Sequence, residues 1–215
     1  MRKTFDAELL ELNEEMTAMA AQAQEAVGLV TRSLTDGDEA TARQALQLEA
    51  GLDQMERDIE NHCLRLLLRQ QPVARDLRTI SAAMKMVTDL QRIGDQAANI
   101  AEISVLLAQG DRVRVPEDIA LMSLRAGTMV EQAIAAYTGR DAEQAAAVIN
   151  LDDEVDDLFS RVKELLIEQI SARREDADSA IDLIIIAKYL ERVADHAVNI
   201  ANWAIFCVTG QLTSS

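Results

Sequence analysis

The sequence predicts an all-α protein of six long helices, arranged as two tandem antiparallel three-helix bundles. Three observations lead to this prediction. The 215 residues are 49% hydrophobic but only 3% aromatic, with 8 Gly and 2 Pro, and a chain rich in Ala and Leu and poor in helix breakers favours helices. Short polar stretches divide the chain into six long segments. The first three segments resemble the last three.

Five breaks separate the six segments. Residues 35–38 read TDGD, in which a glycine ends one helix and an aspartate can cap the next. Pro72 prevents the second helix from continuing. Residues 109–118 form the longest polar connection and place a proline at a helix start. Residues 138–141, TGRD, repeat the first break, and residues 172–179, ARREDADS, repeat the second. The helices are therefore expected at about 4–35, 38–70, 73–109, 117–138, 141–171 and 177–208.

The chain contains an internal duplication. Residues 34–53 align with residues 137–156 at an offset of 103. Residues 89–101, DLQRIGDQAANIA, align with residues 189–201, YLERVADHAVNIA, at an offset of 100. The offset falls from 103 to 100, so the second copy is three residues shorter, and the loss falls in the turn after the fifth helix. This is expected for two copies of one three-helix unit.

Each copy is expected to form one antiparallel bundle around its third helix. Small and apolar residues recur there at steps of three and four, which is the period of a buried helical seam. In the sixth helix the seam consists of Leu183, Ala187, Leu190, Ala194, Ala197, Ala201 and Ala204. The two repeats are assigned to residues 1–111 and 112–215.

The charge of the chain limits its partners. With 37 acidic and 21 basic residues, the formal net charge is −16. Such a field repels nucleic-acid phosphates and anionic membrane surfaces, and it favours cations or basic faces of other proteins.

The sequence also predicts a cytoplasmic location. Cys63 and Cys207 stand apart among apolar neighbours, as small buried residues do in a reducing compartment. The N-terminus turns acidic before an apolar signal segment can form, and the longest aliphatic run, residues 183–187, is far shorter than the roughly 20 residues of a membrane span.

Acidic residues repeat at helical spacing beside the seams. Residues four apart share a helix face, and like charges at that spacing destabilise a helix by a few tenths of a kcal/mol. The acids could form a solvated face, be neutralised by Arg92 and Arg192, or bind a hard cation. The rows comprise Glu49 and Asp53, Gln91 and Asp95, Asp152 and Asp156, and Glu191 and Asp195.

Enzymatic chemistry has no support in the sequence. Ferritin-like di-iron bundles use Glu-x-x-His pairs, but the residues three before His62 and His196 are Ile59 and Val193. There is also no Walker-type phosphate loop and no nucleophile with an obvious base partner.

Together, the two third-helix signatures and the stretch RQQPVARDLR at residues 69–78 resemble the PhoU family of phosphate-uptake regulators along essentially the whole chain. The resemblance implies a cytoplasmic, usually homodimeric signalling adaptor without enzymatic activity. It implies negative regulation of phosphate uptake and of the phosphate-starvation response. The implied partners are the ATPase subunit of the phosphate ABC transporter and a sensor histidine kinase.

The resemblance also implies metal binding, with iron, zinc or magnesium as the candidate ions. Its Glu/Asp-x-x-x-Asp motif is intact at Glu191 and Asp195, which should lie opposite Asp152 and Asp156. In the first repeat Gln91 replaces an acid, which keeps one oxygen ligand but removes a charge, so weaker binding is expected there. Two alternatives remain open: a carboxylate-cluster protein of metal homeostasis or storage, and a helical scaffold that binds no metal.

Overall fold

The computed structural model describes residues 2–70, 72–109, 114–172 and 177–211. Within these residues there are six helices and no strand. Every helix boundary lies within two residues of its predicted position, a difference that is ordinary for helix ends. The predicted boundary between the repeats, at residues 111 and 112, lies outside the described residues. The helices are α1 (Arg2–Asp36), α2 (Glu39–Gln70), α3 (Ala74–Gln109), α4 (Glu117–Gly139), α5 (Ala142–Ala172) and α6 (Ala177–Thr209).

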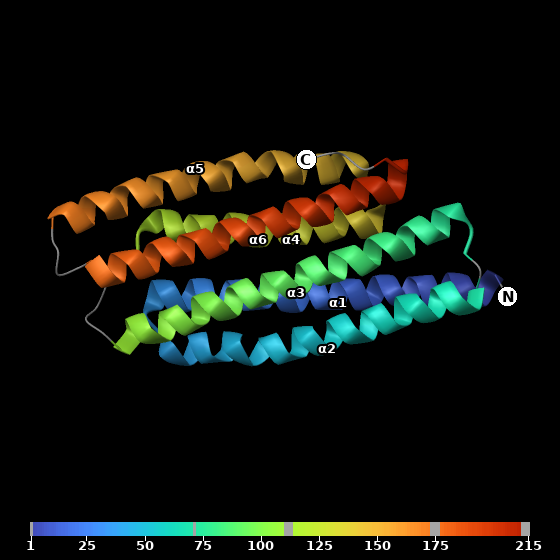
Figure 1. The fold of residues 1–215 in the computed structure, drawn as a ribbon, viewed down its shortest axis with the longest axis horizontal. Helices are drawn as coiled ribbons and strands as arrows, with labels where there is room; N and C mark the ends of the chain where they lie inside the picture. Colours follow the sequence, from blue (N-terminus) through green and yellow to red (C-terminus); the bar gives the residue numbers. More distant parts are fainter. Residues whose placement is uncertain (1, 71, 110–113, 173–176, 212–215) are drawn as a thin grey trace.

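The helices form two three-helix bundles that lie side by side along their length (Figure 1). α2 packs against α1 and α3, and α5 packs against α4 and α6. The bundles join where α3 packs against α6 and α1 against α4. α3 and α6 run in opposite directions (Figure 1), so the start of α3 meets the end of α6. There the Cys207 thiol donates to the backbone carbonyl of Arg78 over 3.9 Å.

The predicted seam of α6 is confirmed, because all seven of its residues are buried. The equivalent row of α3 is buried as well, and it includes Gly94. A Cβ atom at Gly94 would lie only 2.4 Å from Cδ1 of Leu52, so glycine is what allows α2 to approach α3 closely. Small residues along both seams therefore set the spacing of the helices.

Two aspartates begin the middle helices, as the turn sequences predict. The backbone N–H of Ala40 donates to Oδ1 of Asp38 over 3.0 Å. In the second repeat the N–H groups of Glu143 and Gln144 donate to Oδ1 of Asp141 over 3.0 and 2.9 Å. These bonds satisfy amide groups that have no partner inside the helix.

Both cysteines are free and buried, which confirms their predicted packing role. In the described part of the chain, no helix is long and apolar enough to cross a membrane.

Candidate functional site

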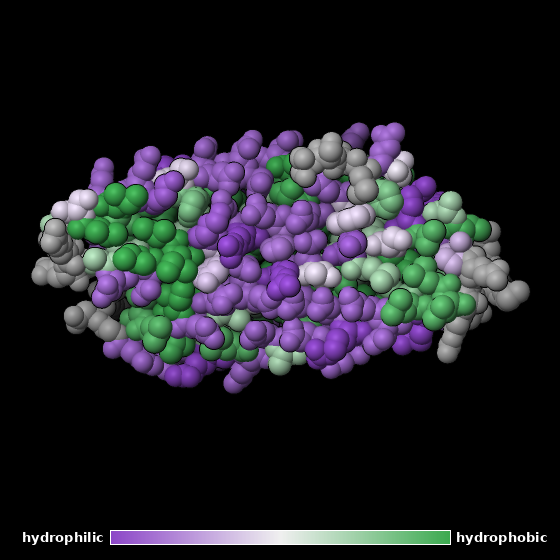
Figure 2. All heavy atoms as spheres, viewed as in Figure 1, coloured by the Kyte–Doolittle hydropathy of each residue, from purple (hydrophilic) through white to green (hydrophobic). Residues whose placement is uncertain are grey.

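The face of the molecule formed by α3 and α6 is hydrophilic across its middle and apolar toward both ends (Figure 2). The predicted acid rows belong to the paired helices of each bundle, α2 with α3 and α5 with α6. We define the first cluster as Glu49, Asp53, Gln91 and Asp95, and the second cluster as Asp152, Asp156, Glu191 and Asp195.

The second cluster brings its four carboxylates close enough to perturb one another. Burial, followed by the charges of Asp156 and Asp195 and the weaker effects of Asp153 and Glu191, raises the pKa of Asp152 to about 6. Burial and the neighbouring acids also raise the pKa values of Asp156 and Asp195. The Oδ1 atom of Asp152 is buried and has no hydrogen-bond partner. The cluster therefore holds more negative charge than its surroundings neutralise.

Lys188 partly neutralises the second cluster. Its ammonium group forms an ion pair with the carboxylate of Glu191 and lies 5.4 Å from the ring centre of Phe159. The same charge acts to lower the pKa values of Asp156 and Asp195, although burial outweighs it. Arg192, which the sequence indicated for this role, also acts to lower the pKa of Asp195, although its guanidinium stacks over the ring of Tyr189, at 5.9 Å. The i, i+3 spacing of Lys188 and Glu191 was the signal for this ion pair.

The first cluster is internally hydrogen-bonded. Nε2 of Gln91 donates to Oδ1 of Asp53 over 3.1 Å and to Oδ1 of Asp95 over 2.6 Å. Arg92 forms an ion pair with the other oxygen of Asp95 over 3.0 Å, as anticipated for this arginine. The amide nitrogen of Gln91 thus acts as a donor between two acids, while its carbonyl oxygen remains, so its role as an oxygen ligand stays a prediction. A neutral donor satisfies carboxylates without a cation.

The two clusters differ in how well their donors suit a metal ion. Among the described residues, no three His, Cys, Asp or Glu side chains converge as a metal site. The second cluster fits a cation in charge and chemistry, because its donors are all carboxylate oxygens and one buried oxygen of Asp152 lacks a partner. Its side chains would have to turn inward around the ion. In the first cluster Gln91 already donates to one oxygen each of Asp53 and Asp95, which agrees with the expectation of weaker binding there, and that expectation stays a prediction.

Neither histidine joins the acid clusters. His62 is buried between α1 and α2, with Nδ1 2.7 Å from Oε2 of Glu15, which agrees with a structural role. Nδ1 of His196 lies 2.9 Å from Oδ1 of Asp89, and Nδ2 of Asn199 donates to the same oxygen over 3.2 Å. Asp89 thus links α3 to α6 rather than extending the first cluster. This contact depends on the packing of the two repeats, and no local signal in the sequence indicates it.

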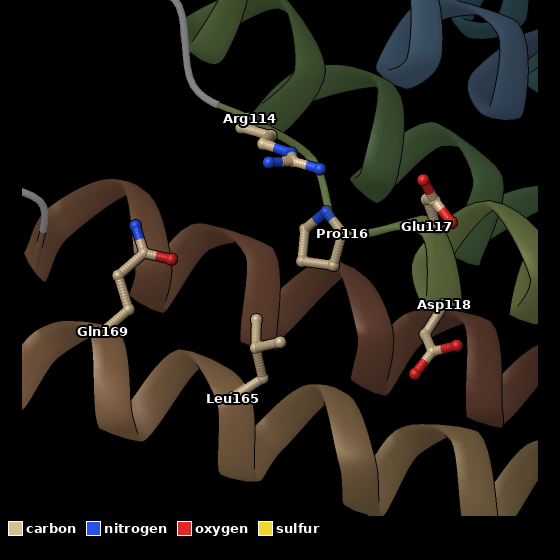
Figure 3. A pocket seen from close by; sticks show the side chains of 6 residues that line it. All are labelled: Arg114, Pro116, Glu117, Asp118, Leu165 and Gln169. Atoms are coloured by element: carbon tan, nitrogen blue, oxygen red, sulfur yellow. The ribbon is translucent and has the colours of Figure 1, made fainter.

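A separate open pocket lies between the start of α4 and the end of α5 (Figure 3). Its volume is about 620 Å³. The lining mixes one arginine with two acids, and one of those acids, Asp118, is paired with Arg161 over 3.2 Å. Such a lining presents no group of converging donors or acceptors. The residues shown are Arg114, Pro116, Glu117, Asp118, Leu165 and Gln169.

Comparison with known proteins gives one consistent result. A model of the PhoU domain family matches residues 16–104 and again residues 119–204. The phosphate-specific transport system accessory protein PhoU homolog of Clostridium acetobutylicum is 32% identical over 211 residues, covering 98% of this chain and 96% of that protein. The crystal structure of PhoU from Pseudomonas aeruginosa superposes with a TM-score of 0.92 at 32% identity, covering 96% of this chain and 100% of that one. The phosphate transport system regulatory protein PhoU from Streptococcus pneumoniae gives a TM-score of 0.91 at 25% identity, covering 98% and 100%.

Proposed function

Because the chain belongs to the PhoU family, we propose that it is a regulatory adaptor of a phosphate transport system. In this role it represses phosphate uptake and the phosphate-starvation response without catalysing a reaction. It works in the cytoplasm, as a homodimer, by contact with the ATPase subunit of the phosphate ABC transporter and with a sensor histidine kinase. The observation that carries the proposal is the match of the PhoU family model to residues 16–104 and again to residues 119–204, with one acid cluster at equivalent positions in each match.

The surface supports a role in protein contacts. Apolar surface lies toward both ends of the α3–α6 face, with a hydrophilic band between (Figure 2). Exposed apolar groups on soluble domains mark interaction sites when they gather in patches. The acidic charge favours a partner with a basic surface. Four exposed apolar residues occur near the α2–α3 turn: Leu64, Leu68, Val73 and Leu77.

We further propose that the second cluster binds a hard cation such as magnesium or ferric iron. Support comes from its all-oxygen donor set, the unpartnered oxygen of Asp152 and the mutual repulsion of its acids. Zinc is less suited, because zinc sites in proteins are mostly built from nitrogen and sulfur ligands. When bound, the cation supplies positive charge that holds α5 and α6 together. It would also displace Lys188 from Glu191.

The regulatory role is tested by deleting the gene in its host and measuring phosphate-starvation transcripts in high phosphate. Deletion should derepress these transcripts, and the wild-type gene should restore repression. Unchanged transcripts in the deletion strain would contradict the adaptor role.

The cation site is tested with the double variant Glu191→Ala, Asp195→Ala. It should lose bound metal in elemental analysis of the purified protein. A control of equal charge change, Asp157→Ala with Glu164→Ala, alters exposed acids of α5 outside the cluster and should keep the metal. If both variants retain metal equally, the second cluster is not the site.

Iron oxidation and metal loading, measured on the same purified protein, distinguish an adaptor from a protein of metal storage. An adaptor should not turn over ferrous iron with oxygen, and its metal content should stay near one ion per chain, at the second cluster. Catalytic iron oxidation, or loading of many ions per chain, would favour metal homeostasis or storage.

A further inference from the structure

A groove of about 330 Å³ lies between α1 and α4, the two helices behind α3 and α6 in the view of Figure 1. Nε2 of Gln24, on α1, donates to Oε2 of Glu131, on α4, over 3.1 Å. Further along the groove, the hydroxyl groups of Thr31 and Ser123 share a hydrogen bond. The later residue of α1 thus pairs with the earlier residue of α4, so the two helices are antiparallel beneath the groove.

Two glycines line this groove although the packing of the chain does not require them. A Cβ atom at Gly28 would meet nothing within 4 Å, and one at Gly127 would meet only a methyl group of Val27, at an ordinary 3.8 Å. At Gly94, by contrast, a Cβ atom would collide with a neighbouring helix. Glycine inside a helix is less favourable than alanine, so the two groove glycines indicate a surface that is kept open toward the outside.

The duplication shows which side chains these glycines leave out. At the offset of 103 between the starts of the two family-model matches, Gly28 aligns with Glu131, and Gly127 aligns with Gln24. One side of the pseudo-twofold axis between the repeats therefore carries two long side chains in contact, Gln24 and Glu131, which we call the ridge. The other side carries two glycines at the matching positions, Gly28 and Gly127, which we call the notch.

Unlike the chain as a whole, the α1–α4 face is electrically neutral. Residues 17–32 and residues 121–138 each hold one acid and one base, whereas the formal net charge of the chain is −16. Two copies of so acidic a protein repel each other across most of their surface, so a neutral face is where they can approach. The charges on this face are also separated, because the exposed acids Glu25 and Glu131 lie at the ridge and the exposed Arg32 lies beyond the notch.

We propose that the α1–α4 face is the interface of a symmetric homodimer. The proposal rests on the homodimer of the proposed function and names the surface that forms it. A twofold axis in the plane of the face, perpendicular to the helices, places the ridge of each copy over the notch of the other. Twofold dimers use such self-complementary surfaces, because the same patch meets its own copy. The same rotation brings the acids at the ridge toward Arg32 of the second copy, so opposite charges face each other across the interface.

Apolar groups complete the match between two copies. Leu124, three residues before Gly127, is 63% exposed and lines the groove. The rotation lays Leu124 over Ala21 and Ala135 of the second copy, which are small and exposed. A leucine against two alanines removes apolar surface from water on both copies. The ridge, the charge pattern and this leucine therefore all fit the same partner, a second copy of this chain.

The interface is tested on the purified protein by sedimentation equilibrium over a range of concentrations. The wild type should be a dimer at micromolar concentration. Gly28→Gln fills the notch with a side chain as long as those of the ridge, where the single chain has open space; a methyl group would leave most of the notch empty. The variant should keep its helical circular dichroism while the dimer dissociation constant rises about tenfold or more. Arg32→Glu sets acids against acids and should act in the same direction, and exchanging the charges, Glu25→Arg with Arg32→Glu, should restore the dimer.

Ala147→Gln is the matched control, because it adds the same side chain at an exposed position of α5 outside the groove. It should form the dimer like the wild type. A dimer that Gly28→Gln and Arg32→Glu leave unchanged overturns this interface but keeps the homodimer of the proposed function. A monomeric wild type, whether its groove stays free or takes up a helix of another protein, overturns both. The adaptor role is measured separately, by the phosphate-starvation transcripts of the deletion strain.

Discussion

Replacing Asp152 by Asn should stabilise the protein when no divalent cation is present. The change removes the charge that burial and the neighbouring acids disfavour most, and it keeps the shape of the side chain. The folded-state pKa of Asp152 is about 6, against a usual value of 3.8. A difference of roughly two units corresponds to about 3 kcal/mol at neutral pH. Because the side chain is only half-buried and solvent screens it, we expect a gain of about 1–2 kcal/mol.

The stability difference between Asp152→Asn and the wild type should depend on pH in a defined direction. Below about pH 4 the carboxyl is protonated in both the folded and the unfolded chain, so the variant and the wild type should be equally stable. Between about pH 4 and pH 6 the unfolded chain releases a proton that the folded chain retains, and the wild type loses stability as the pH rises. Above about pH 7 the difference should be complete.

The assay is thermal and urea denaturation in a chelating buffer at several pH values. For a chain of this size, the gain corresponds to a rise in Tm of about 3–6 °C at pH 7. Asp153→Asn, at the exposed neighbouring position, is the control and should change Tm little. Added magnesium should stabilise the wild type more than Asp152→Asn. A gain in stability that is absent at pH 7, or as large at pH 4 as at pH 7, would refute the conclusion that the charged Asp152 carboxylate destabilises the fold.

Three further predictions follow from the helix contacts and the turns. Gly94→Ala should lower the free energy of unfolding by about 1–3 kcal/mol in urea denaturation, because its methyl group would collide with Leu52, whereas Gly28→Ala, with open space around it, should be neutral or slightly stabilising. Gly37→Ala should cost about 1 kcal/mol in the same measurement despite open space, because φ is 67° there; an unchanged midpoint would contradict this reasoning. Gln91→Glu should destabilise the first cluster by about 1–2 kcal/mol in chelator, because a donor becomes an acceptor. It should also create magnesium-dependent stabilisation, and a variant that is indifferent to magnesium would contradict our account of this cluster.

Much of the fold could be predicted from local patterns. The glycines, prolines and capping aspartates mark where helices end, and the three-four spacing of small residues marks the buried seams. Both signals depend on residues a few positions apart, so each helix boundary falls within two residues of its prediction. Gly94 aligns with Ala194 of the predicted seam at the offset of 100, but the need for glycine there comes from Leu52 on another helix.

The acid clusters could be predicted only in part. Helical spacing predicts that Asp152 and Asp156 share a face, as do Glu191 and Asp195, and the structure brings these four acids together. The i, i+3 spacing of Lys188 and Glu191 permits their ion pair, but only the structure shows that the pair forms.

The sequence by itself determined the helices, their duplication and the rows of acids, because periodicity and helix breaking act over a few neighbouring residues. Only the tertiary structure decided how these polar groups are paired: Gln91 as a donor between acids, Asp89 bonded across the repeats, and Arg140 bonded to Thr79. These contacts join residues that are distant in the chain. Their strength depends on burial and side-chain orientation, which packing fixes after the helices have formed.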